Sequence, residues 1–93
     1  MRYRVNRRTF KQFLEVQVQK LGSERKAAMR AGVSHTLIQS LRTGRETTKD
    51  GRRLPKTHVN LVTARKIESA WGIPEEVCFF PETLDGRSSV EAA

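Results

Sequence analysis

Polar side chains whose hydrogen-bonding groups match the edges of nucleic-acid bases gather in one short stretch of this sequence. The Gln39 amide can bond an adenine edge, and the His35 imidazole can donate to a guanine. The Thr36 methyl group can contact the methyl group of a thymine. Ser34 and Ser40 bound the stretch. This chemistry is base recognition; the alternative for His35 is an ordinary exposed polar residue.

The combinations of residues on which catalysis depends are missing from the sequence. His35 and His58 are far apart and neither has an acidic cluster beside it, so we expect no metal site. Cys78 lies in an apolar run, where it is expected to act as a small hydrophobic residue. There is no carboxylate pair and no glycine-rich phosphate loop. We therefore expect no enzyme, no cofactor and no small-molecule ligand.

Charge is distributed unevenly along the chain, whose formal net charge is +8. Residues 1–66 contain 17 Lys and Arg against 4 Asp and Glu, a net charge of +13, while residues 67–93 carry −5. Most solubilising surfaces mix the two signs. A basic block of this size favours a nucleic-acid partner over an anionic membrane.

Length and composition suit one small domain. The 93 residues are 37% hydrophobic, and the mean hydropathy of −0.60 fits a soluble protein with a modest core. No apolar run approaches the length of a membrane span, and none follows the basic start as a signal peptide would require. One cysteine cannot form an intramolecular disulfide, so we expect a cytoplasmic protein.

The polar stretch belongs to a longer segment, 24–44, whose spacing predicts two helices joined by a tight turn. Gly32 can adopt the positive φ that such a turn needs. Ala28, four positions earlier, is small enough for a close helix crossing, and Ile38 and Leu41 share one face of the second helix. The two helices are predicted over residues 24–31 and 35–42. An ordinary helical hairpin is the alternative.

Segment 24–44 resembles the helix-turn-helix of the lambda-repressor and Cro superfamily of phage and bacterial regulators. The match rests on Ala28, Gly32, Val33, Ile38 and Leu41 at fixed spacing. It extends over residues 63–80, which are similar to that family's fourth and fifth helices. The resemblance implies an all-α, compact five-helix domain over residues 1–81. It also implies a sequence-specific, operator-binding transcriptional regulator of the repressor or Cro type, associated with the bacterial nucleoid.

The resemblance also implies roles for individual residues. The second helix of the motif is expected to enter the major groove and present these side chains to the bases: Ser34, His35, Thr36, Gln39 and Ser40. Phosphate contacts are expected from basic residues around it: Arg25, Lys26, Arg30, Arg42, Arg45, Lys49, Arg52, Arg53 and Lys56. Glu24 departs from the family pattern, which often has a phosphate-holding glutamine there.

Basic segments flank the predicted helices on both sides. Asp50-Gly51 is a strong turn signal, so segment 45–57 is predicted to form a short hairpin that clamps phosphates like a small wing. The alternative is a disordered, solvated loop. A basic N-terminal arm precedes the first helix, which is predicted to end at Leu21. The arm either contacts DNA or is a frayed terminus, and its basic residues are Arg2, Arg4, Arg7 and Arg8.

Two further helices are predicted towards the C-terminus, over residues 61–71 and 74–80. The second of them begins with Pro74, a favoured first helical residue. Its apolar residues either close the domain's own core or form a homodimer interface, and they are Val77, Phe79 and Phe80. The acidic segment 82–93 is predicted to be a disordered tail.

Two other functions stay open at this stage. The basic hairpin would also suit a winged, excisionase-like architectural factor, which strong DNA bending would reveal. A basic protein-interaction module of the antitoxin or anti-repressor type would keep its main binding activity after nuclease treatment.

Overall fold

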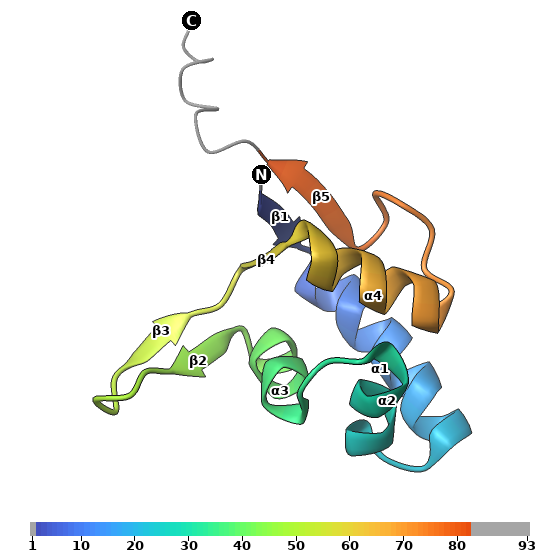
Figure 1. The fold of residues 1–93 in the computed structure, drawn as a ribbon, viewed down its shortest axis with the longest axis horizontal. Coiled ribbons are helices and arrows are strands. Elements are labelled where there is room, and N and C mark those ends of the chain that lie inside the picture. Colours follow the sequence, from blue (N-terminus) through green and yellow to red (C-terminus); the bar gives the residue numbers. More distant parts are fainter. Residues whose placement is uncertain (1, 83–93) are drawn as a thin grey trace, which may run out of the picture.

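The computed structural model describes residues 2–82 (Figure 1). Its helices begin and end where the sequence supplies caps. A Ser or Asn side chain accepts a hydrogen bond from the first turn of every helix, and a glycine in the left-handed region ends each one. The helices are α1 (Arg7–Leu21), α2 (Glu24–Ala31), α3 (His35–Thr43) and α4 (Leu61–Trp71). These four ranges match the predicted helices closely.

Five short strands accompany the helices in the part of the chain that the structure describes. They are β1 (Arg2–Val5), β2 (Arg45–Thr47), β3 (Arg53–Pro55), β4 (His58–Asn60) and β5 (Phe79–Glu82). β1 lies between β4 and β5 in an antiparallel sheet, with Tyr3 opposite both Val59 and Pro81. The prediction of an all-α, five-helix domain is therefore wrong: residues 2–82 combine four helices with a three-stranded sheet and a hairpin.

The predicted N-terminal arm is instead the central strand of that sheet. Residues 2–5 alternate arginine with Tyr3 and Val5, and this is the two-residue period of a strand with one buried face. Tyr3 is buried in the core, whereas Arg2 and Arg4 are exposed. Strand pairing on both sides holds the segment against the domain, so it cannot act as a free arm.

The predicted fifth helix over residues 74–80 does not form. Residues 75–77 make a turn, and Glu76 has a φ of +60°, which no right-handed helix accommodates. The chain then enters β5, where Phe79 is fully buried and Phe80 is partly buried. Aromatic residues are favoured in strands, and pairing with β1 satisfies the backbone that a helix would otherwise have satisfied internally.

The core joins three elements through aromatic side chains. The Phe10 ring on α1 lies 5.5 Å from the Trp71 ring on α4 and 6.4 Å from the Phe79 ring on β5. Trp71 also donates its indole N–H to the Ala27 carbonyl on α2, at 3.1 Å. Cys78 is buried beside this cluster, and burial raises the pKa of its thiol to about 12. The thiol therefore stays protonated and acts as a small hydrophobic group.

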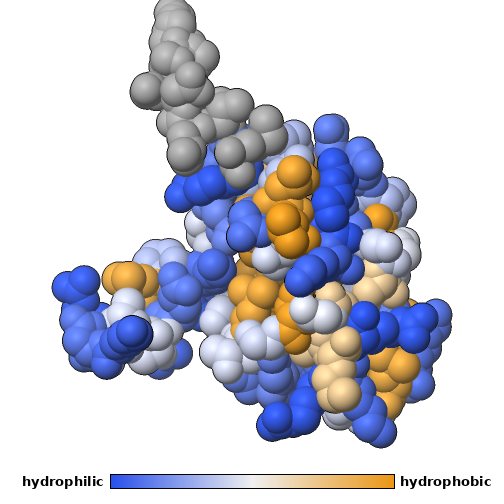
Figure 2. All heavy atoms as spheres, in the orientation of Figure 1, coloured by the Kyte–Doolittle hydropathy of each residue, from blue (hydrophilic) through white to orange (hydrophobic). Residues whose placement is uncertain are grey.

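Strands β2 and β3 form a hairpin that projects from the body of the domain (Figure 1). Glu46 lies opposite Leu54, and the turn contains Gly51 with a φ of +87°. All residues of both strands are exposed. Figure 2 shows the hairpin as hydrophilic apart from one spot, and Leu54 is its exposed large hydrophobic residue. The predicted hairpin across Asp50-Gly51 is thus present.

No helix among the described residues is long and apolar enough to cross a membrane.

Candidate nucleic-acid interface

Helices α2 and α3 meet around the turn at Gly32, whose φ is +72°. The Val33 N–H bonds to the Ala28 carbonyl at 3.1 Å and closes the turn. Ala28 is buried at the helix crossing, and Ile38 and Leu41 bury the inner face of α3. The opposite face of α3 is consequently left to solvent.

The exposed face of α3 carries a row of polar side chains. Thr36, Gln39 and Thr43 are all exposed and recur at intervals of three and four residues, which places them on one stripe. Ser34, at the beginning of the helix, is also exposed, but its hydroxyl accepts the Leu37 N–H as a cap. Thr43 was not predicted, although the same periodicity would have found it.

Two predicted base contacts are placed differently. Ser40 is nearly buried, although it lines the same groove between α3 and the hairpin as Thr36 and Thr43, its neighbours one helical turn away. His35 is partly buried, and its Nε2 donates a hydrogen bond to Glu24 Oε1 at 2.9 Å. The other oxygen of the same carboxylate accepts from Arg42 Nε at 2.5 Å. Glu24 therefore holds His35 and Arg42 against the beginning of α2.

Replacing Glu24 with glutamine is expected to raise affinity for random duplex DNA and to weaken discrimination between sequences. The change removes a negative charge beside the candidate interface, and it releases two basic side chains that the carboxylate now orients. Titrations of labelled random and selected duplexes by fluorescence anisotropy would measure both effects. Glu76→Gln removes an exposed acid from the turn between α4 and β5, outside both hollows beside α3, and is the matched control. Equal behaviour of the two variants would contradict the expectation.

A groove of about 550 Å³ separates the exposed stripe of α3 from the hairpin. Its α3 wall includes Thr36, Gln39 and Thr43, and its hairpin wall includes Arg45 and Arg53. Antiparallel pairing places Arg53 opposite Thr47, and Arg45 lies two residues before Thr47 on the same face of the ribbon. The groove thus has hydrogen-bonding groups on one side and two guanidinium groups on the other.

The other residues predicted to contact phosphates are dispersed over the surface. Lys49 and Arg52 are exposed at the tip of the hairpin, and Arg52 Nε lies 3.8 Å from Asp50. Lys56 lies 4.0 Å from Glu46 at the base of the hairpin. Arg25 and Lys26 are exposed on α2. None of these five basic residues is among those that line the groove.

Two predicted basic contacts, Arg30 and Arg4, are committed to other parts of the protein. Arg30 donates to the Ala70 carbonyl, which places it against the end of α4. Arg4 lies 3.7 Å from Glu82 in β5, and His58 also bonds Glu82 at 2.6 Å. The hydrogen bond from His58 lowers the pKa of the Glu82 carboxyl, with the nearby charges adding to it. The His58–Glu82 pair joins β4 and β5, the two edge strands of the sheet.

Negative charge gathers around α4 and β5. Glu68 is buried and accepts a hydrogen bond from Arg65 at 2.9 Å, and Arg65 also lies 3.1 Å from Glu75. In the region that the structure describes, no three His, Cys, Asp or Glu side chains come together as a metal site would need. The carboxylates of Glu68, Glu75 and Glu82 are instead paired with Arg65, Arg4 and His58.

The predicted homodimer residues contribute unequally to the surface. Phe79 is fully buried in the domain's own core, Phe80 is partly buried and Val77 is 37% exposed. β5 is an edge strand, and Pro81 within it has no N–H to donate to a further strand. Phe79 is therefore committed to the monomer's interior.

No protein-family model, curated protein or solved structure matches this chain. Its function is therefore inferred from its residues and their geometry.

Proposed function

We propose that this protein is a sequence-specific regulator that binds double-stranded DNA through a helix-turn-helix. The observation that carries the proposal is the polar stripe of Thr36, Gln39 and Thr43 facing Arg45 and Arg53 across an open groove. Base edges require hydrogen-bonding groups on a protruding element, and phosphates require cations beside it. The net charge of +13 over residues 1–66 supports the same partner.

In this proposal α3 enters the major groove and the hairpin lies along the adjacent backbone. Gln39, at the centre of the stripe, bonds an adenine edge, and the Thr36 methyl contacts a thymine. Arg45 and Arg53 neutralise phosphates and supply the salt-dependent part of the affinity. Occupying an operator blocks polymerase, so repression needs no catalytic group.

A winged architectural factor is the second candidate, because the hairpin follows α3 directly and projects from the body (Figure 1). Such a factor would bend its DNA. Circular-permutation gel shifts on a bound duplex would separate the candidates, since a simple operator binder leaves the mobility nearly independent of the position of the site.

Selection from a randomised duplex pool tests the leading proposal. At about 0.15 M salt, non-specific phosphate binding is already weak. We expect a motif of several defined base pairs to emerge. Replacing Gln39 with alanine should remove that motif from the selected pool. A palindromic motif would indicate a two-fold dimer with half-sites about 10 bp apart. Recovery of unenriched sequences would refute base recognition by α3.

A further inference from the structure

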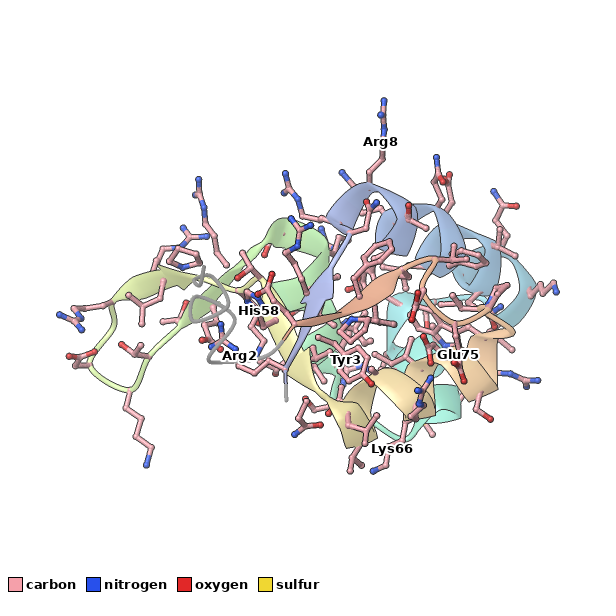
Figure 3. All side chains as sticks on the ribbon, turned by 90° about the horizontal axis from the view of Figure 1, so that it is seen from above. Arg2, Tyr3, Arg8, His58, Lys66 and Glu75 are labelled. Carbon is pink, nitrogen blue, oxygen red and sulfur yellow. The ribbon has the colours of Figure 1, made fainter. Side chains whose placement is uncertain are left out.

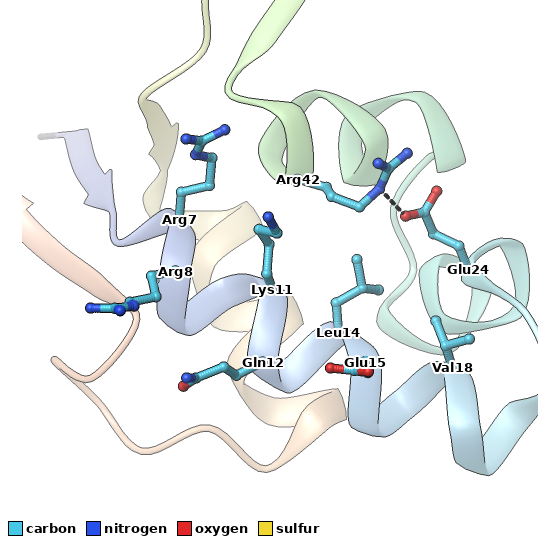
Figure 4. Close-up of a pocket in the computed structure, with 9 residues that line it drawn as sticks. All are labelled: Arg7, Arg8, Lys11, Gln12, Leu14, Glu15, Val18, Glu24 and Arg42. Carbon is cyan, nitrogen blue, oxygen red and sulfur yellow. Dashed lines mark hydrogen bonds and ion pairs between the residues drawn. The ribbon is translucent and has the colours of Figure 1, made fainter.

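A second hollow, of about 540 Å³, lies on the other side of α3, between α3, α1 and the beginning of α2 (Figure 4). Leu14 and Val18 form its apolar floor. Four cationic side chains surround it, and they are Arg7, Arg8, Lys11 and Arg42. Only one of them, Arg42, also lines the groove beside the hairpin, so the two hollows adjoin across α3.

Two of these cations are free to bind an external anion. Arg8 and Lys11 are exposed, and no carboxylate within residues 2–82 forms an ion pair with either. The charge of Glu24, on the far wall, is already shared by His35 and Arg42. Glu15 is the other acid at the hollow, so positive charge is in excess there.

The hollow is held in a defined position relative to the candidate recognition helix. Arg7 Nη1 donates to the Thr43 carbonyl at 2.9 Å, which ties the beginning of α1 to the end of α3. Around the axis of α3, Arg42 lies on the α1 side of Gln39, and Thr36 lies on the hairpin side. The exposed stripe is therefore flanked by α1 on one side and by the hairpin on the other.

A helix in the major groove has a sugar–phosphate strand on each side, because the groove is about 12 Å wide and both strands border it. The hairpin supplies cations on only one side of α3. We propose that Arg8 and Lys11 bind the sugar–phosphate backbone of the opposite strand. The apolar floor accommodates a deoxyribose and the cationic rim accommodates its phosphates. This inference rests on the proposed function and adds a second phosphate clamp to it.

The chemistry of the hollow suits this occupant. A phosphodiester chain alternates an anionic phosphate with a largely apolar sugar face, and the hollow places Leu14 and Val18 between basic side chains. Arg8 and Lys11 are three residues apart, so they project from neighbouring positions on α1. The two clamps together fix the orientation of α3 in the groove, because phosphate contacts position a protein on the duplex.

The double variant Arg8→Gln/Lys11→Gln tests the inference on the duplex selected by the wild-type protein. Each phosphate contact contributes about fivefold to affinity at 0.15 M salt through counterion release. We expect affinity to fall about 30-fold and the slope of log affinity against log salt to decrease by about 2. The preferred base sequence should not change. The variant Arg8→Lys/Lys11→Gln, which keeps one of the two charges, should restore part of the slope.

The variant Lys20→Gln/Lys66→Gln is the matched control, since it removes the same charge from exposed helical positions outside the hollow. Arg8 and Lys66 project to opposite sides of the molecule (Figure 3). Ethylation interference maps the phosphates that the protein contacts on each DNA strand. The α1 variant should lose interference on one strand, and a hairpin variant should lose it on the other. Equal salt slopes for the α1 variant and the control would overturn the inference while leaving the proposed function intact. Failure of the wild-type protein to select any duplex would refute both.

Discussion

Reversing two charges on the hairpin, with Arg45→Glu/Arg53→Glu, is expected to weaken binding to the selected duplex at least about 100-fold at 0.15 M salt. Both side chains line the groove beside α3 and lie on one face of the ribbon. The change removes two phosphate contacts and places two negative charges against the DNA backbone. Titrations over a range of salt concentrations would measure the loss, with a decrease of about 2 or more in the salt slope.

The conservative variant Arg45→Lys/Arg53→Lys keeps the charge and should retain most of the affinity. Lys20→Glu/Lys66→Glu reverses two charges at exposed positions away from the groove and should cost far less. Because every residue of β2 and β3 is exposed, the reversal disturbs no core contact. Comparable binding by the hairpin variant and the reversed control would exclude the hairpin from the interface.

Truncating Phe10 to alanine is expected to lower the free energy of unfolding by about 4 kcal/mol. Phe10 is fully buried and packs against Trp71 and Phe79, so the change leaves a cavity where α1, α4 and β5 meet. A loss of this size is a large part of the ~5–15 kcal/mol by which domains are usually stable. Denaturant titration followed by circular dichroism would measure it.

Val16→Ala on the same helix is the control, because Val16 is 46% exposed and its truncation leaves no enclosed cavity. We expect that variant to lose less than about 1 kcal/mol. If both variants unfolded at the same denaturant concentration, the aromatic cluster would not be the centre of the core. Burial of Phe79 against Phe10 would then not account for the pairing of β5 with β1.

The four helices could be predicted because their signals are local. Asn60 and Gly72 bracket α4, and each acts within a few residues through a side-chain cap or a left-handed backbone. The turn at Gly32 was equally readable, since a close crossing needs a small residue and a positive φ at a fixed spacing. Such interactions span few residues, so the order of residues alone specifies them.

The sheet could not be predicted in the same way. Arg2 pairs with Asn60 on one side and Glu82 on the other, and the intervening sequence carries no mark of either register. The segment after Gly72 has the proline and acidic residues typical of a helix start, yet its phenylalanines gain more from burial against β1 and Phe10. Tertiary packing overrides a weak local preference there.

The features of the candidate site divide in the same way, into those set by the local sequence and those set by tertiary packing. The sequence by itself determined the basic character of the first two-thirds of the chain, the two helices joined by the turn at Gly32 and the polar content of α3. Only the tertiary structure decided that Ser40 is buried, that Glu24 holds His35 and Arg42, and that α1 brings Arg8 and Lys11 beside α3. Capping and periodicity act between near neighbours in the chain, whereas these contacts depend on how separate helices pack against one shared core.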